Sequence, residues 1–158
     1  LQVSEEIWAM FDPTGALPHD PATVVVDTTG QVRLTADLMS TPDGAQPEGE
    51  LLSLNINDLT ARFAGAALTG KGAFTFDNTD LETYDGMPAP TGTLDMTLTG
   101  GNGLLDKLVT MGLVPEDQAM GARMMIAMFA KAGEGEDVLT STLEFKDKHF
   151  YANGQQLQ

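Results

Sequence analysis

The segment Gly100–Lys131 constrains the fold most, because it is the only part of the chain whose apolar residues recur with a period near 3.6. Elsewhere apolar and polar residues alternate with a period of two, which is typical of strands that bury one face. The sequence therefore predicts a β-sheet that lies against, or wraps around, a pair of consecutive helices.

The first helix is expected over Asn102–Met111, with Asn102 as its capping residue and Gly112 just past its end. An asparagine oxygen can accept an otherwise unpaired backbone N–H, and glycine readily adopts the left-handed conformation that ends a helix. Pro115 is expected at the start of the second helix, where its missing N–H is not needed. The second helix is then expected to run over residues 116–131.

The second helix is apolar on almost every side, and Arg123 is the only charge in its interior. Such a helix is either deeply buried or lines something apolar. It is shorter than the roughly 20 residues that span a membrane. Methionine adapts to irregular surfaces, so two interpretations stay open: ordinary core packing, or an adaptable contact surface. The residues of the candidate apolar contact surface are Met120, Met124, Met125, Met128 and Phe129.

The remaining chain is expected to form strands separated by loops rich in glycine, proline and acidic residues. Ser4–Phe11 fits either a short helix or a strand, with Trp8 as a core anchor. A hairpin is expected across residues 28–30 and an exposed loop at Ser40–Gly49, while Gly70 and Gly72 indicate a bend or bulge. The expected strands are residues 22–27, 31–37, 51–56, 60–64, 67–77, 92–99, 138–145 and 149–152, with a final one within 154–158.

Together these elements predict an α+β fold. We expect an extended, curved, mostly antiparallel sheet of about eight strands, with two consecutive apolar helices (about 102–111 and 116–131) packed on one face. A chain of 158 residues is long enough for one domain with a sizeable core, so residues 1–158 are expected to form a single β-rich domain.

The net charge of −15 opposes binding to nucleic acid and to anionic membrane surfaces. The chain has no cysteine, which excludes disulfides, thiol catalysis and thiolate metal sites. His19 and His149 lack partners at ligand spacing and are expected at the surface. The acidic segment Asp77–Asp85 is either a solvated loop or a calcium site, although its spacing does not match an EF-hand.

No nucleophile elbow, dinucleotide-binding glycine pattern or phosphate-binding loop occurs in the chain. No pair of carboxylates is distinguished by its context as an acid–base pair. The sequence therefore predicts no enzyme, no cofactor and no catalytic or metal-binding residue.

Four segments together carry a resemblance to a known family: Leu68–Asp77, Gly92–Thr99, Leu104–Leu108 and Met111–Gln118. The chain resembles the C-terminal part of a family of uncharacterised alphaproteobacterial envelope proteins, which is similar in pattern to AsmA-like proteins. The closing Tyr151–Gln155 fits the same family. The resemblance carries no functional residue with it.

The resemblance implies a periplasmic location and a leader or membrane anchor upstream of Leu1. The chain would then be the C-terminal portion of a longer protein. AsmA-like proteins further suggest an apolar groove and a role in envelope lipid homeostasis. That step is an analogy between folds.

Two functions follow from these expectations. The first is a non-catalytic periplasmic envelope protein that presents an apolar groove or surface to a lipid-like ligand, or to an upstream segment of its own chain. The alternative is a structural or accessory subunit that docks on a larger membrane-associated assembly through its Met-rich helix or its acidic surface.

Overall fold

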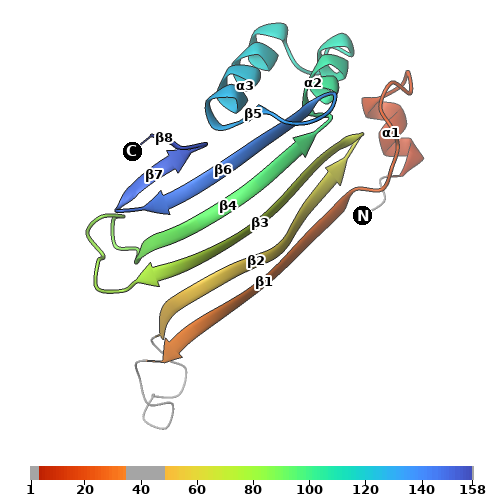
Figure 1. The fold of residues 1–158 in the computed structure, drawn as a ribbon. Coiled ribbons are helices and arrows are strands. Elements are labelled where there is room, and N and C mark those ends of the chain that lie inside the picture. The colour runs from red at the N-terminus through yellow and green to blue at the C-terminus, as the bar shows by residue number, and fades with distance from the viewer. Residues whose placement is uncertain (1–3, 35–48, 158) are drawn as a thin grey trace.

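The computed structural model describes residues 4–34 and 49–157, which form one open antiparallel sheet with helices at one end (Figure 1). The strands are β1 (Thr23–Leu34), β2 (Gly49–Phe63), β3 (Ala66–Asp77), β4 (Ala89–Thr99), β5 (Lys131–Ala132), β6 (Val138–Lys146), β7 (His149–Ala152) and β8 (Gln155–Gln156). The helices are α1 (Glu5–Phe11), α2 (Gly101–Thr110) and α3 (Glu116–Phe129).

The strand order is β1-β2-β3-β4-β6-β7-β8, and β5 pairs with β6 off this path. All the strand pairs of the described residues are antiparallel. The predicted α+β class, with about eight antiparallel strands and two consecutive helices on one side, is confirmed. No helix within the described ranges has both the length and the apolarity to span a membrane.

The register of the strands divides the sheet into two chemically different faces, because residues paired directly across neighbouring strands point to the same side. We call the side that carries most of the large hydrophobic residues the apolar face. It consists of Val24, Val26, Leu54, Ile56, Leu59, Leu68, Phe74, Leu94, Met96, Leu98, Leu139, Leu143, Phe145 and Phe150. The opposite side, the polar face, carries threonines and charged residues such as Asp27, Thr60, Lys71, Asp95 and Thr142.

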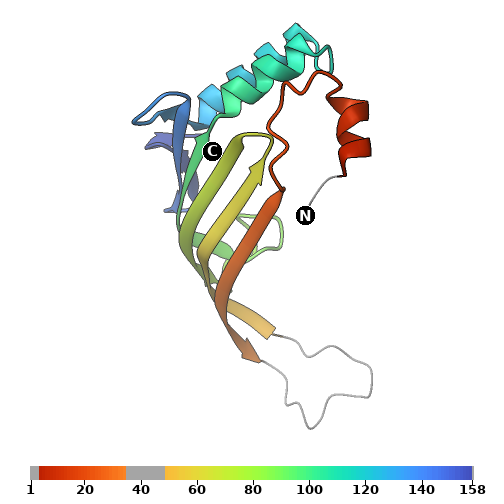
Figure 2. The ribbon, with the colours of Figure 1, turned by 90° about the vertical axis from the view of Figure 1, so that its right-hand side faces the viewer.

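The long strands bend along their length, and the sheet is visibly curved (Figure 2). A bulge in β2 contributes to this bend, because Asn57 and Asp58 together oppose Lys71 of β3. Lys71 stands between Gly70 and Gly72, so the irregularity expected at these glycines is confirmed, although the extra residue lies on the neighbouring strand.

The hairpin predicted across residues 28–30 is wrong. β1 runs straight through this position, since Gly30 keeps a negative φ and pairs with Leu54. The two strands predicted at 51–56 and 60–64 are likewise one strand, because the bulge at Asn57 lets β2 continue rather than turn. The end of the strand expected at 31–37 and most of the loop expected at Ser40–Gly49 lie outside the described residues.

A distant carboxylate caps α2, in place of the expected Asn102. Both oxygens of Asp137 accept backbone hydrogen bonds, from Asn102 N–H at 3.1 Å and from Gly103 N–H at 2.8 Å. Burial raises the pKa of this carboxyl, but these hydrogen bonds outweigh burial and hold the pKa below its usual range. The helix therefore depends on the turn before β6 for its first N–H groups.

The other end of α2 follows the sequence prediction. Gly112 has a φ of 74°, and its N–H donates to the carbonyl of Val109, while Leu113 N–H reaches back to Leu108. This double closure satisfies two of the last carbonyl groups of the helix. Pro115 is the N-cap of α3 rather than its first helical residue, and the helix ends at Phe129 instead of Lys131.

Within the described ranges, a compact cluster of buried apolar residues lies at the helical end. Trp8 is 4% exposed and packs with Leu17 and Ala64, against Leu104 and Leu108 of α2. Trp8 is therefore the core anchor that the sequence predicted. Of the two structures expected for Ser4–Phe11, helix or strand, the segment forms the helix. Among the described residues no large side chain is fully buried, so most of the apolar face has no second layer over it.

Candidate apolar binding site

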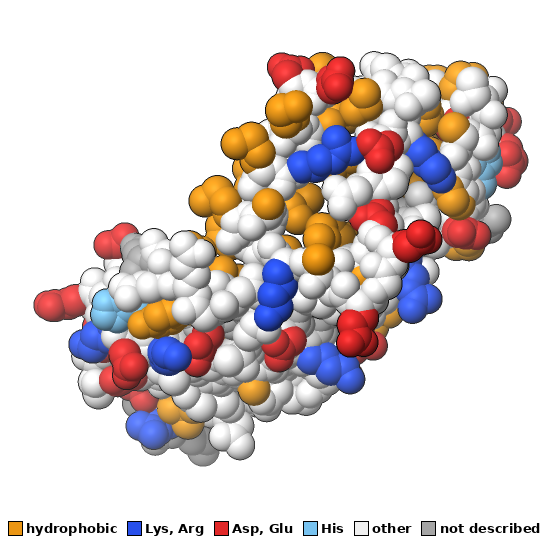
Figure 3. Space-filling model, turned by 45° about the horizontal axis from the view of Figure 1, so that its top comes forward, with side chains coloured by type: hydrophobic (Ala, Val, Ile, Leu, Met, Phe, Trp, Pro, Cys, Tyr) orange, Lys and Arg blue, Asp and Glu red, His pale blue; other side chains and the backbone are white. Residues whose placement is uncertain are grey.

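Three of the four methionines of α3 lie on its outer side. Met120, Met124 and Met128 are spaced by four residues, which places them on one side of the helix. Their exposed fractions are 57%, 66% and 64%. Of the two alternatives expected for this helix, these exposed fractions exclude deep burial. The three side chains form an exposed apolar stripe, which we call the Met ridge. Hydrophobic side chains are visible along the helical end of the molecule (Figure 3).

The inner side of α3 faces the sheet. Ala119 is fully buried, and Ile126 and Phe129 are half-buried. Between this side and the apolar face lies a cleft of about 240 Å³, which we call the α3 cleft. It is lined by Leu68, Met96, Leu98, Met125, Ile126, Phe129, Ala130, Leu139 and Ser141. Two predicted contact residues, Met125 and Phe129, therefore line this cleft, whereas the three residues of the Met ridge point elsewhere.

The polar groups beside the α3 cleft are already engaged. The hydroxyl of Ser141 donates a hydrogen bond to the carbonyl of Phe129, and Asn153 Nδ2 donates to the same oxygen at 2.9 Å. These bonds fasten the last turn of α3 to β6 and to the turn after β7. Because Ser141 is satisfied within the protein, the cleft offers a ligand an almost wholly apolar wall.

A second apolar cleft of about 280 Å³ adjoins the first and shares Leu68 and Leu98 with it. Its wall includes Val24 of β1, Phe63 of β2 and Leu104 of α2. The two clefts together form an apolar strip that runs along the sheet where the helices approach it. Apolar cavities of about 150 Å³ already bind molecules such as benzene, so this space is large enough for a hydrocarbon ligand.

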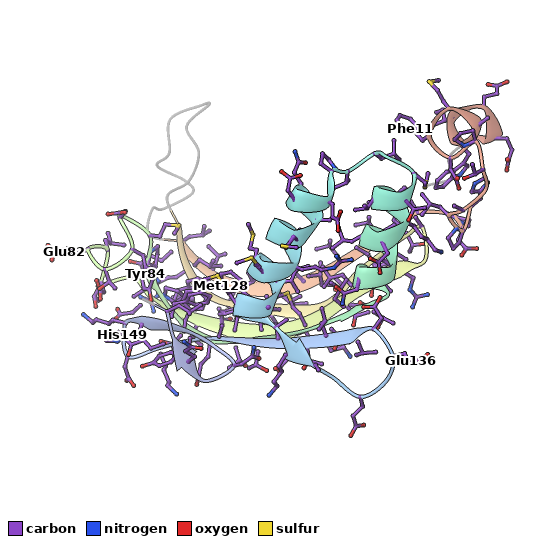
Figure 4. The ribbon with its side chains drawn as sticks, turned by 90° about the horizontal axis from the view of Figure 1, so that it is seen from above. Phe11, Glu82, Tyr84, Met128, Glu136 and His149 are labelled. Atoms are coloured by element: carbon purple, nitrogen blue, oxygen red, sulfur yellow. The ribbon has the colours of Figure 1, made fainter. Side chains whose placement is uncertain are left out.

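The apolar face continues beyond the helices toward an aromatic cluster. Phe145 lies 6.2 Å from Phe74, 4.8 Å from Phe150 and 6.1 Å from Tyr84, measured between ring centroids. The hydroxyl oxygen of Tyr84 is buried and has no hydrogen-bond partner among the described residues. Tyr84 lies at the end of the sheet remote from α1 (Figure 4).

The two helices are joined at their surface by Arg123 of α3 and Asp106 of α2, whose nearest atoms are 2.5 Å apart. Both side chains are substantially exposed, so this ion pair adds little stability.

Two carboxylates of the acidic segment Asp77–Asp85, those of Asp77 and Asp80, are engaged by protein groups. Asp80 accepts from the backbone and hydroxyl of Thr83 and forms an ion pair with Lys148 at 2.7 Å. Its pKa is lowered, mainly by the hydrogen bond from Lys148 and then by those from Thr83. Asp77 accepts from Thr79. In the part of the chain that the structure describes, no group of three or more His, Asp or Glu could hold a metal ion.

The two histidines differ in their surroundings. Both histidines are exposed, as predicted, and 31% of the His19 side chain is accessible. His19 Nε2 lies 3.4 Å from the buried carboxylate of Asp12. Burial raises the pKa of Asp12, but hydrogen bonds from Leu17, Ala16, Thr14 and His19 lower it to about 2.

Only part of this site has a signal in the sequence. The spacing of Met120, Met124 and Met128 was visible as a helical stripe, although not the side of the helix that would be covered. The engagement of Ser141 and Asn153 with the end of α3 had no sequence signal, since these residues meet Phe129 only after the sheet has folded.

The described residues therefore form a sheet with one largely open apolar face, which α2 and α3 border at one end. No curated protein and no solved structure matches the chain. A family model matches residues 9–153, and the chain belongs to this family of uncharacterised proteins conserved in bacteria, DUF2125.

Proposed function

We propose that this protein is a non-catalytic binding protein for acyl-chain-like, lipid-type molecules. The observation that supports it is the apolar face, which α2 and α3 border at one end and leave open elsewhere. A water-soluble domain gains stability by covering such a surface, and an aliphatic chain laid along the strip would cover it.

The size of the expected gain supports an acyl chain. Each buried methylene contributes about 0.8 kcal/mol, so about ten methylenes would contribute roughly 8 kcal/mol before the cost of ordering the ligand. Met125 and Met96, in the wall of the α3 cleft, can adapt their flexible thioethers to chains of different shape. An apolar wall with flexible methionines favours a class of ligands with acyl chains over a single compound.

The polar part of the ligand is proposed to lie toward the aromatic cluster. There the Tyr84 hydroxyl lacks a partner among the described residues, and a hydroxyl or carbonyl oxygen of a ligand would satisfy it. The net charge of −15 disfavours anionic head groups, so neutral or zwitterionic lipids are the proposed class.

The compartment is proposed to be the periplasm. This proposal rests on the resemblance to alphaproteobacterial envelope proteins and to AsmA-like proteins, which also suggests an upstream leader or anchor and a role in envelope lipid homeostasis. Fractionation of bacteria that express the natural full-length protein, with periplasmic and cytoplasmic marker enzymes, tests the location.

Ligand binding is tested with the natural full-length protein after lipid extraction. A neutral fluorescent probe, N-phenyl-1-naphthylamine, should bind and should be displaced by lysophosphatidylcholine. Met125 is 64% exposed but lines the α3 cleft, so Met125→Glu places a carboxylate against a bound probe. Probe binding should weaken at least tenfold, since the apolar probe would remove water from this charge without pairing it.

The matched control is Met10→Glu, because Met10 of α1 is 75% exposed and lies outside both clefts. Its probe binding should stay at the level of the unsubstituted protein. Equal binding by Met125→Glu and Met10→Glu, with both variants folded by circular dichroism, would exclude the α3 cleft as the site.

The Met ridge favours a second candidate function, which is docking on a larger membrane-associated assembly. Three exposed methionines in one stripe offer an adaptable apolar contact. Met124→Asp should then leave folding and probe binding intact while removing a stoichiometric partner from affinity purifications of envelope extracts. Retention of every co-purified protein by Met124→Asp would argue against this function.

A further inference from the structure

We infer that the outer edge of β1 pairs with β1 of a second copy of this chain, antiparallel and symmetric about Gly30. This inference is independent of the proposed ligand function, because it concerns the edge of the sheet rather than the apolar face.

The two edges of the sheet are very different. The edge at β8 is a strand of two residues, which offers few groups for pairing. The edge at β1 is a strand of twelve residues, all of them exposed, and within the described ranges β1 pairs only with β2. Native proteins usually protect an edge with short strands, prolines or several charges. β1 contains no proline and only two charged residues, Asp27 and Arg33.

These two charges select the partner and the register. In an antiparallel pair centred on Gly30, Asp27 of each copy lies directly opposite Arg33 of the other, so two ion pairs form by symmetry. Shifting the register by two residues in either direction removes both pairs. A twofold axis at Gly30 also keeps each residue opposite one on the same face, as pairing requires.

The surroundings of Asp27 support a cation at its open side. Across the ladder Asp27 pairs with Asp58 of β2, and like charges directly opposite each other are unfavourable. Asn57 Nδ2 donates to Asp27 at 3.3 Å, but within the described residues no lysine or arginine forms an ion pair with Asp27. Arg33 already lies 3.2 Å from Glu50 and is 65% exposed, so it has room for a second carboxylate.

The same register matches the apolar side of β1. It places Val26 opposite Leu34 of the second copy and Thr28 opposite Val32 of the second copy. Val26, Val32 and Leu34 are 64%, 59% and 48% exposed, so this pairing covers apolar surface that the single chain leaves in water. The apolar faces of the two copies then lie on the same side of one continuous sheet.

Charge exchange in the natural full-length protein tests this inference by sedimentation equilibrium. The unsubstituted protein should be a dimer. Asp27→Arg and Arg33→Asp should each raise the dimer dissociation constant roughly tenfold or more, because like charges then face each other at two symmetric positions. A mixture of the two variants should form a heterodimer, since every facing pair is again of opposite sign.

Glu134→Arg and Lys131→Asp are the matched controls, because they make the same charge changes at exposed positions away from β1 and should stay dimeric. A monomeric unsubstituted protein overturns the inference. A dimer that persists in both Asp27→Arg and Arg33→Asp also overturns it. So does a mixture of the two folded variants that fails to form a heterodimer, which is the result expected if β1 instead pairs with a different protein.

The absence of cysteine allows a second test that does not depend on affinity. Thr29 faces Gln31 of the second copy in this register, within the distance that a disulfide can bridge. Oxidation of a mixture of Thr29→Cys and Gln31→Cys proteins should give a covalent heterodimer in high yield. Either variant alone should give much less, and equal yields in all three samples would exclude the register.

Discussion

The indole ring of Trp8 lies parallel to the imidazole of His19, with ring centroids 4.4 Å apart and an interplanar angle of 6°. Phe63 stacks on Trp8 as well, at 5.7 Å. Trp8 therefore joins α1, the loop before β1 and the turn between β2 and β3. Because few side chains of the described residues are buried, this cluster carries a large share of the packing.

Replacing Trp8 with alanine should destabilise the protein by about 3–5 kcal/mol, because it removes a buried aromatic ring and leaves a cavity. Urea unfolding followed by circular dichroism measures the change. Met10→Ala is the control, since its side chain is 75% exposed and its loss should change stability by no more than about 0.5 kcal/mol. Similar losses for both variants would show that Trp8 is not the anchor.

Asp12 should make stability depend on acid pH. Its pKa is about 2 in the folded protein and 3.8 ordinarily, so the unfolded chain binds the proton more readily. The stabilisation is then complete above about pH 4 and is lost as the pH falls toward 2. Asp12→Asn should lower the melting temperature at pH 6, and its difference from the unsubstituted protein should shrink at pH 2. A difference that is the same at both pH values would contradict this cause.

Asp137, rather than Asn102, should control the stability of α2. Asp137→Gly removes the carboxylate that accepts from Gly103 N–H, and glycine still fits the φ of 49° at this position. We expect a loss of about 1 kcal/mol, as for other helix caps. Asn102→Ala should lose less, because the Asn102 backbone N–H still reaches Asp137. Chemical denaturation measures the loss of stability of both variants. A larger loss for Asn102→Ala than for Asp137→Gly would show that Asn102 caps the helix, as expected from the sequence.

Two glycines should respond to alanine in opposite directions. At Gly92 in β4 an added Cβ would lie only 2.0 Å from the carbonyl oxygen of Ala73, so Gly92→Ala should strongly destabilise or prevent folding. At Gly121 in α3 an added Cβ meets nothing within 4 Å. Gly121→Ala should stabilise the protein by roughly 0.5–1 kcal/mol through helix propensity. Thermal unfolding of both variants provides the comparison, and a harmless Gly92→Ala would contradict the close pairing of β3 and β4.

Several features could be predicted because they depend on neighbours in the sequence. The period of two identified the strand expected at 92–99, which is part of β4, and Gly112 identified the end of a helix. The wrong hairpin at residues 28–30 arose because a glycine after two threonines fits a turn and an extended strand equally well. Pairing of Gly30 with Leu54 decided between them, and that contact joins residues far apart in the chain.

The sequence by itself determined the periods of two and 3.6, and with them the class of most elements and the side on which their apolar residues lie. Only the tertiary structure decided which apolar sides are covered: Leu108 of α2 packs against the Trp8 cluster, whereas Met124 of α3 faces outward. The physical reason is that periodicity records the direction of a side chain relative to its own backbone, while burial depends on whether another layer of chain lies there.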